Sequence, residues 1–480
     1  MASVEFSDSI TTIGVCAFRG CTGLTSIKLP SSVTTIRDSA FSGCSGLTSI
    51  EVPNSVTTIG VNAFASCPNL TSVIYNSDAY ESSIFVDSPV SDLTIGMTTL
   101  PDHMAGHIGI EASLKRLTLT DRVTTIGDHA FDGYTGLTSV ELPGSITTIG
   151  HYAFHGCTGL TSVEIPGSIT TIGNGSFSNC SNLTSVINNS DAYADGMFNG
   201  CSVSDLTIGG TMVPNNMASN IGVWNSLKRL ILTDKVNTIG DSAFSGCSGL
   251  TSIELPSSVT TIGEFAFSDC AGLTSIELPS SVTTIGHVAF RGCTGITSIE
   301  IPSSVKTIGD SAFSDCTGLT SVEIPSSVTT IGENVFSDCT NLTSVIYNSD
   351  AYALHIFSGC QVSDLTIGGC ALPKGIAHYI GVRESLKRLT LVGNVTTIGE
   401  MAFHGCTSLT SVELPSSITT IGQSAFYDCA ALTSIEIPSS VTTIGEMAFQ
   451  NCTGLTSVEI SNSLTEIYSQ VFYNCTGLTS

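Results

Sequence analysis

Residues 316–332 read CTGLTSVEIPSSVTTIG, and nearly the same letters recur at 247–263, 270–286, 293–309, 406–422 and 429–445. The period is 23 residues, and phenylalanine marks it from Phe18 to Phe472. Self-similarity at a fixed period of this length indicates a solenoid, in which each repeat contacts only its neighbours. The sequence therefore predicts one elongated domain over residues 1–480, although a globular chain of this length would suggest roughly two to four domains.

The consensus rung is L-T-S-I-E-I-P-S-S-V-T-T-I-G-x-x-A-F-x-x-C-x-G, and its positions are numbered so that the first rung starts at Met1. Apolar residues at positions 1, 4 and 6 predict a short strand with one buried face, which the proline at position 7 ends. The side chains at positions 10 and 13 also point inward, and the glycine at position 14 permits a tight bend. Positions 17, 18 and 21 then predict a helical or 3₁₀ turn. Each rung would bury eight side chains against rungs stacked about 4.8 Å apart.

These motifs resemble the BspA-like class of leucine-rich repeats, and the resemblance covers essentially the whole chain. It implies a right-handed curved solenoid of about 21–22 rungs, with a parallel β-sheet on the concave face and short strands and 3₁₀ or helical turns on the convex side. It also implies a protein that is secreted or displayed at the cell surface of a bacterium or protist, where several members act in adhesion. The family has no shared catalytic set.

The 23-residue repeat is interrupted in three places, at residues 74–120, 187–233 and 346–389. Each of these irregular modules contains the motifs I-x-N-S-D-A-Y, V-S-D-L-T-I-G and S-L-K-R-L-x-L. The predicted strands of these three motifs and of the regular rung that follows are spaced by 20, 24 and 23 residues. The modules are therefore predicted to be pairs of altered rungs through which the solenoid continues. The regular rungs occupy 1–73, 121–186, 234–345 and 390–480.

Charge narrows the classes of partner. The net charge is −25, with a pI near 4.4, which argues against nucleic acid and anionic membranes and leaves a cationic protein or glycan ligand as an open class. No apolar run approaches the ~20 residues that a membrane span requires, so this chain is not expected to insert into a membrane. The first residues, MASVEFSDSI, do not resemble a signal peptide.

Two charge patterns are candidate ligand-binding features. Position 5 is glutamate in eleven rungs, and the longest unbroken row is Glu254, Glu277, Glu300 and Glu323. Such a row favours a cationic partner, with calcium as a minor alternative, or it is simply a solvated acidic face. The modules place a Lys-Arg pair at positions 2 and 3, namely Lys115 and Arg116, Lys228 and Arg229, and Lys387 and Arg388. These pairs either bind a ligand or relieve repulsion between the glutamates.

The cysteines and histidines do not form a recognisable catalytic or metal-binding motif. Fourteen of the eighteen cysteines hold position 21, where we expect reduced core thiols, since the ~4.8 Å rung spacing exceeds the usual disulfide Cβ separation and no C-x-x-C zinc spacing occurs. The nine histidines are scattered, and no nucleophile, metalloprotease or P-loop motif occurs. We therefore predict no enzymatic activity, no catalytic residue, no metal site and no cofactor.

The predicted function is a binding or adhesion surface that engages protein or glycan through the concave face. A second hypothesis is structural. The chain opens at Met1 and Ala2 and stops at Ser480, all at strand positions without a polar cap, so it is either a fragment of a longer protein or a unit that stacks head to tail into filaments. A third and minor hypothesis is that the repeated Thr-Thr at positions 11 and 12 binds ice or a mineral surface.

Overall fold

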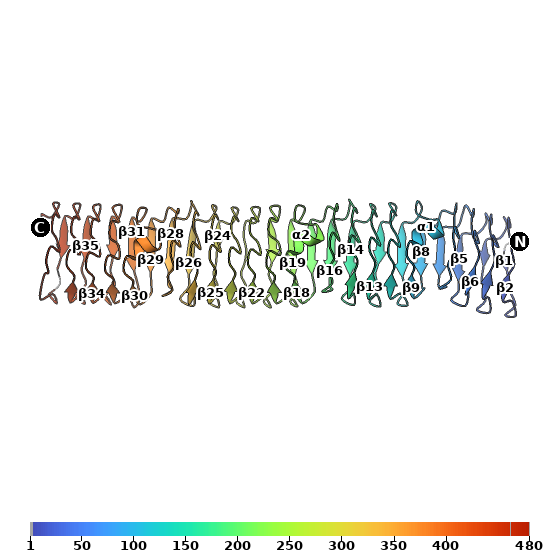
Figure 1. Cartoon of the computed structure of the whole chain (residues 1–480), viewed down its shortest axis with the longest axis horizontal. Helices are drawn as coiled ribbons and strands as arrows, with labels where there is room; N and C mark the ends of the chain where they lie inside the picture. The colour runs from blue at the N-terminus through green and yellow to red at the C-terminus, as the bar shows by residue number, and fades with distance from the viewer. Residues whose placement is uncertain (1–2, 461, 480) are drawn as a thin grey trace. The chain divides into compact units, whose positions relative to one another are not determined.

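The computed structural model describes residues 3–460 and 462–479. Met1, Ala2 and Ser480, on which the prediction of open ends depends, lie outside the described residues. The chain forms two compact units. Unit 1 comprises Met1–Thr211 and Ala218–Lys235, and unit 2 comprises Met212–Met217 and Val236–Ser480. Within each unit, strands of successive rungs lie side by side (Figure 1). That residues 1–480 form one continuous solenoid stays a prediction.

The first strand of a rung lies within positions 3 to 6, and the rung at residues 273–295 has no first strand. In unit 1 these strands are β1 (Ser3–Val4), β3 (Ser26–Ile27), β5 (Ser49–Val52), β7 (Ser72–Tyr75), β8 (Asp92–Ile95), β10 (Arg116–Leu119), β12 (Ser139–Glu141), β14 (Ser162–Ile165), β16 (Ser185–Asn188), β17 (Asp205–Ile208) and β19 (Arg229–Leu232). In unit 2 they are β21 (Ser252–Glu254), β24 (Ser298–Ile299), β26 (Ser321–Ile324), β28 (Ser344–Tyr347), β29 (Asp364–Ile367), β31 (Arg388–Leu391), β33 (Ser411–Glu413), β35 (Ser434–Glu436) and β37 (Ser457–Glu459).

A second strand covers positions 12 and 13 and builds a second set of parallel pairs. In unit 1 these strands are β2 (Thr12–Ile13), β4 (Thr35–Ile36), β6 (Thr58–Ile59), β9 (Thr99–Leu100), β11 (Thr125–Ile126), β13 (Thr148–Ile149) and β15 (Thr171–Ile172). In unit 2 they are β18 (Met212–Val213), β20 (Thr238–Ile239), β22 (Thr261–Ile262), β23 (Thr284–Ile285), β25 (Thr307–Ile308), β27 (Thr330–Ile331), β30 (Ala371–Leu372), β32 (Thr397–Ile398), β34 (Thr420–Ile421) and β36 (Thr443–Ile444).

The fold is thus a parallel-strand β-solenoid of leucine-rich-repeat type, as predicted. The period-2 alternation of the first strand decides which side chains enter the core. In β5, Ile50 and Val52 are buried while Ser49 and Glu51 are exposed. The eight inward positions of that rung are all buried, as expected: Leu47, Ile50, Val52, Val56, Ile59, Ala63, Phe64 and Cys67.

The phenylalanines at position 18 stack on one another inside the coil. Phe41 and Phe64, for example, have ring centroids 5.1 Å apart and planes inclined by 4°. This confirms the predicted aromatic spine within each run of rungs. The modules interrupt it, because a short helix replaces the phenylalanine in their second rung. In the first module, the amide of Phe85 donates a 3.0 Å hydrogen bond to the carbonyl of Ile108 in α1, as the amide of Phe41 does to the carbonyl of Ala63 in the regular rungs.

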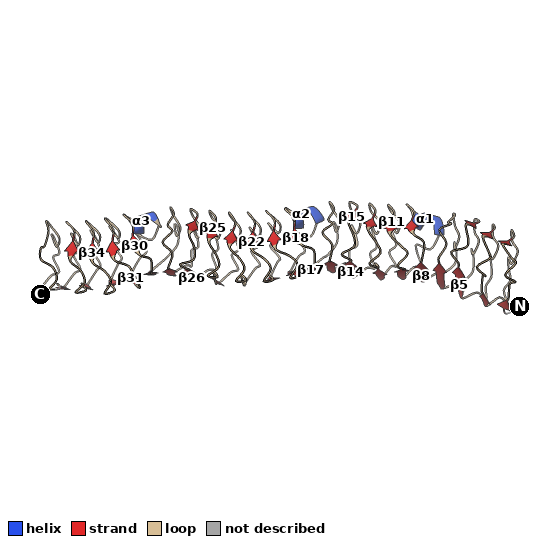
Figure 2. Ribbon diagram, turned by 90° about the horizontal axis from the view of Figure 1, so that it is seen from below, coloured by secondary structure: helices blue, strands red, loops and turns tan. Residues whose placement is uncertain are grey.

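The turn side of the regular rungs differs from the expected helical or 3₁₀ turn. It is a series of hydrogen-bonded turns, because positions 16 and 20 usually have a left-handed backbone that a helix cannot contain, as at Ser39 (φ 53°) and Gly43 (φ 73°). Among the described residues, helix occurs only in the modules, as α1 (Met104–Ile108), α2 (Met217–Ile221) and α3 (Ile376–Tyr379), drawn in blue in Figure 2.

The modules keep the strand register despite their unequal lengths. Ser72 of β7 pairs with Asp92 of β8, Asp92 pairs with Arg116 of β10, and Arg116 pairs with Ser139 of β12. These pairs reproduce the predicted spacings of 20, 24 and 23 residues. The differences in length are absorbed on the turn side, and in the first module the outward strand face continues from β7 to β12 without a break.

Candidate ligand-binding surface

The predicted glutamate row lies on the outward face of the rungs of unit 2, although residues 275–278 around Glu277 form no strand. The side chains of Glu254, Glu277, Glu300 and Glu323 are all exposed. The register of β24 with β26, in which Ile299 pairs with Val322, places Glu300 beside Glu323. Further along the same unit, Glu436 of β35 pairs directly with Glu459 of β37. Position 5 therefore presents carboxylates from adjacent rungs, at a spacing where like charges repel.

An asparagine of each module contacts the last glutamate of the preceding row. The amide Nδ2 of Asn348 donates to Oε1 of Glu323 at 3.0 Å, and Asn189 donates to Glu164 in the same way at 3.0 Å. Asn76 donates to Glu51 at 3.4 Å. Sequence reasoning missed these contacts, although the asparagine of I-x-N-S-D-A-Y always follows the glutamate by 25 residues.

The arginines of the modules form ion pairs across the sheet. Nε of Arg388 lies 2.7 Å from Oδ1 of Asp364, and Nε of Arg116 lies 3.5 Å from Oδ1 of Asp92. In the second module, Arg229 pairs in register with Asp205. The predicted positive spots in the first and third modules therefore carry an Asp–Arg pair beside an exposed lysine, Lys115 or Lys387. The sequence signal for these ion pairs is the aspartate of V-S-D-L-T-I-G, which lies 24 residues before each arginine.

Position 5 of the modules is uncharged, which breaks the glutamate rows. In the first module Ile74 pairs with Thr94, and Thr94 pairs with Thr118. The equivalent residues are Ile187, Thr207 and Ile231 in the second module and Ile346, Thr366 and Thr390 in the third. The isoleucines Ile74, Ile187 and Ile346 are 36–39% exposed. We call each of these three-residue sets a neutral strip.

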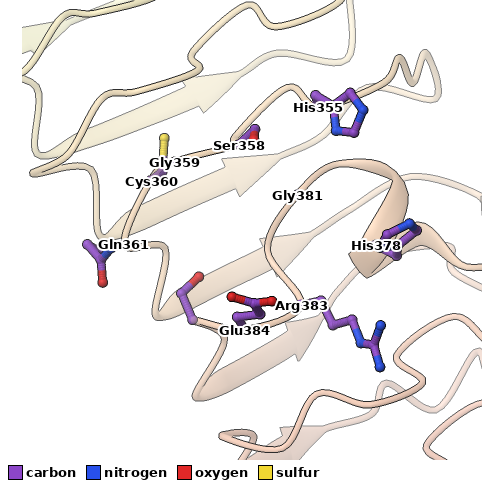
Figure 3. A pocket seen from close by; sticks show the side chains of 10 residues that line it. His355, Ser358, Gly359, Cys360, Gln361, His378, Gly381, Arg383 and Glu384 are labelled. Carbon is purple, nitrogen blue, oxygen red and sulfur yellow. The ribbon is translucent and has the colours of Figure 1, made fainter.

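Hollows on the turn side also border the modules. One of about 510 Å³ lies in the third module, where it is lined by side chains of neighbouring rungs that include His355, Gln361, His378 from α3, and Glu384 (Figure 3). Arg383 lines it as well, and its Nε lies 3.4 Å from the carbonyl oxygen of Gly405. Sequence reasoning treated the histidines as scattered and did not bring these residues together.

The cysteines fit a structural role. All eighteen are free, and those of the position-21 ladder are mostly buried, as predicted. The thiol of Cys270 donates to the carbonyl of Phe244 at 3.3 Å, a contact that recurs along the ladder. Burial raises the pKa of the Cys247 thiol to about 12, which keeps it protonated at neutral pH. Cys370 is exposed.

The described part of the chain has neither a cluster of metal-binding side chains nor a helix suited to a membrane. Over residues 3–460 and 462–479, no three His, Cys, Asp or Glu side chains gather in a way that could hold a metal ion. No helix over the same residues has the length and apolarity that crossing a membrane requires.

Comparison with known proteins gives the family. The family model described as BspA type leucine rich repeat region (6 copies) matches residues 1–104, 110–220, 223–343, 269–370 and 375–480. A leucine-rich repeat protein from Bacteroides ovatus ATCC 8483 is 26% identical, with 98% of this chain and 81% of that chain covered and a TM-score of 0.29. A leucine rich cell surface protein from Faecalibacterium prausnitzii A2-165 is also 26% identical, with 76% and 86% covered and a TM-score of 0.27. None of the curated proteins compared matches the sequence. The chain belongs to the BspA-type leucine-rich repeat family.

Proposed function

We propose that this chain is a non-enzymatic binding scaffold of a cell-surface or secreted protein, and that its outward strand face engages a protein ligand with a positively charged contact surface. The observation that carries the proposal is the alternation on that face. Rows of exposed glutamates are broken three times by a neutral strip with an exposed isoleucine. Membership of the BspA-type leucine-rich repeat family supports a binding role for the chain in general.

The two kinds of surface would do different work. Exposed carboxylates such as Glu277 and Glu300 accept hydrogen bonds from lysine or arginine of a partner, and each such pair contributes about 0.2–1 kcal/mol. They also speed the encounter with a cationic partner, since the whole chain carries a net charge of −25. An isoleucine such as Ile346 offers apolar area that can be buried in the complex. The neutral strips would thus anchor the ligand, and the glutamate rows would orient it.

The experiment uses a fluorescently labelled decalysine peptide and the full chain, with affinity measured by anisotropy. Substituting Glu277, Glu300 and Glu323 by glutamine should weaken binding by about tenfold, because three charge pairs of the size given above are lost. The matched control substitutes Glu264, Glu333 and Glu446, which are exposed on the turn side, by glutamine. Both variants change the net charge by the same amount.

The control should weaken binding much less than the strand-face variant. Equal losses in the two variants would show that the peptide responds only to net charge, and would overturn the assignment of the strand face. To test the anchor, the decalysine is compared with a peptide of the same charge that contains three leucines. Its advantage should vanish when Ile74, Ile187 and Ile346 are changed to serine.

A further inference from the structure

A stack of three rings runs across the turn side of unit 1. His103, His129 and Tyr152 occupy position 16 of successive rungs, all with a left-handed backbone (φ 52°, 54° and 54°). The rings of His103 and His129 are 4.8 Å apart and inclined by 12°. Those of His129 and Tyr152 are 5.1 Å apart and inclined by 21°. One face of the Tyr152 ring is therefore covered by the stack.

The stack ends because the next two residues of the series are glycines. Gly175 and Gly196 share the left-handed backbone, with φ of 63° and 62°. A Cβ atom on Gly175 would lie 2.5 Å from Cε1 of Tyr152, so a side chain at this position would collide with the ring. A hollow of about 340 Å³ opens next to the tyrosine, and its other lining side chains include His155, Asn179, Asp195 and Asn199.

A hydrogen-bonded relay fixes the polar side of this hollow. The carboxylate of Asp132 accepts from Nδ1 of His129 at 2.9 Å and from Nδ1 of His155 at 2.7 Å. In this tautomer Nε2 of His155 is an acceptor, and it lies 2.9 Å from the amide Nδ2 of Asn179. His155 and Asn179 are thus held in place at the wall of the hollow. Asp195 and Asn199 are exposed at its rim.

The lining combines one aromatic wall with amide, carboxylate and imidazole groups. A pyranose ring fits this combination, because its C–H face can pack on an aromatic ring while its equatorial hydroxyl groups donate and accept hydrogen bonds around the edge. The volume is at the lower end of the range for ligand pockets, about 300–1,000 Å³, which suits one small ring. We propose that this hollow is a binding site for a single neutral pyranose unit of a glycan, stacked on Tyr152.

Other ring-shaped ligands fit less well. A phenyl side chain from a partner protein could pack on Tyr152 but would form no hydrogen bonds with Asn179, Asp195 and Asn199. A nucleotide or an acidic sugar would bring negative charge next to Asp195, in a chain whose net charge is already −25. The site lies on the turn side, not on the strand face, so it is independent of the function proposed above.

The test uses the full chain and the methyl glycosides of glucose, galactose, mannose, N-acetylglucosamine and fucose as probes. Saturation-transfer difference NMR should show at least one of them binding, with the strongest transfer to the C–H protons of one ring face. N-acetyl-tyrosinamide is measured in parallel as the aromatic alternative. If that compound binds and no glycoside does, the site takes an aromatic side chain and the proposal is overturned. Transfer from no probe overturns it equally.

Two variants locate the site. Tyr152→Ala removes the aromatic wall and should weaken the glycoside by about tenfold or more. Phe265→Ala is the matched control, because Phe265 holds the same rung position in unit 2, also has a left-handed backbone, and is 41% exposed like Tyr152. Its affinity for the glycoside should equal that of the wild type. An equal loss in the two variants would contradict the assignment.

Gly196→Ser gives a second test that leaves the tyrosine in place. A Cβ at this glycine meets nothing closer than 3.6 Å, and serine adopts the same left-handed backbone at the equivalent Ser242 and Ser311. The variant should therefore fold normally and fill the mouth of the hollow, which abolishes glycoside binding. The strand-face variant Glu277→Gln/Glu300→Gln/Glu323→Gln should bind the glycoside as the wild type does, which separates a failure of this proposal from a failure of the proposed function.

Discussion

Single side chains of the turn side link one rung to the next, and Asp132 is the clearest case. It bridges His129 of its own rung and His155 of the following rung. Burial alone would raise the pKa of Asp132, but the hydrogen bonds from the two histidines outweigh it and lower the pKa below its ordinary value. The ionised form of Asp132 is therefore more favourable in the folded chain than in the unfolded chain.

The sign of the pH dependence follows from this shift. A carboxylate whose pKa is depressed on folding contributes stability above its ordinary pKa and loses it as the pH falls through the folded value. Asp132→Asn should therefore destabilise unit 1 at pH 5, and the difference from wild type should shrink below about pH 4. Urea unfolding followed by the fluorescence of Trp224, the one tryptophan of the chain, measures it. A difference that is the same at pH 5 and pH 3 would contradict this role.

In the turn of a rung, positions 16 and 18 lie close together in the sequence but can have opposite surroundings. In the rung of unit 2 that follows β22, Phe267 is fully buried in the aromatic spine while Phe265, two residues earlier, is exposed. The left-handed backbone at Phe265 turns its side chain away from the core. The ring of Phe267 packs between those of Phe244 and Phe290, at 5.5 and 5.4 Å.

Alanine substitutions should separate the two phenylalanines sharply. Phe267→Ala removes a ring from a packed core and should cost about 3–5 kcal/mol of unfolding free energy. Phe265→Ala should cost about 1 kcal/mol or less, as expected of an exposed site. Urea unfolding followed by circular dichroism compares the two variants with the wild type. Similar costs would mean that Phe267 is not part of a packed spine.

The sequence predicted this inward set well, because a strict period identifies every buried position at once, Phe267 included. It predicted the candidate site less well. The contacts from Arg388 to Asp364 and from Asn348 to Glu323 join residues 24 and 25 apart, while the regular period is 23. Such contacts depend on how unequal rungs align. The left-handed backbone at Phe265 was also not predicted, since serine, valine, methionine and phenylalanine all occupy that position and none of them favours φ above zero.

Charge acts on the whole molecule. The chain has 40 acidic and 15 basic residues, and adjacent glutamates at position 5 concentrate the negative charge on one face of the rungs. Like charges about 4.8 Å apart repel, and salt screens this repulsion because the Debye length falls from about 30 Å at 10 mM to about 8 Å at 150 mM. Electrostatic repulsion therefore opposes the stability that the core provides.

We expect the unfolding midpoint to rise when salt is raised from about 10 to about 150 mM. Glu277→Gln/Glu300→Gln/Glu323→Gln should stabilise the chain at low salt by roughly 1 kcal/mol, and its midpoint should depend less on salt. The control Glu264→Gln/Glu333→Gln/Glu446→Gln removes the same charge from rungs that are not adjacent and should have the smaller effect. Thermal unfolding at the two salt concentrations measures both variants. A larger effect in the control would contradict the repulsion along the row.

Near-identical rungs create a problem of alignment during folding. A growing coil that skipped one regular rung would still place phenylalanine on phenylalanine and glutamate beside glutamate, so little would distinguish the mistake. A slip that crossed a module would set Arg116 against a residue other than Asp92 and align the helix α1 with a turn that forms no helix. We therefore expect the three modules to confine any misalignment to the regular rungs that lie between them.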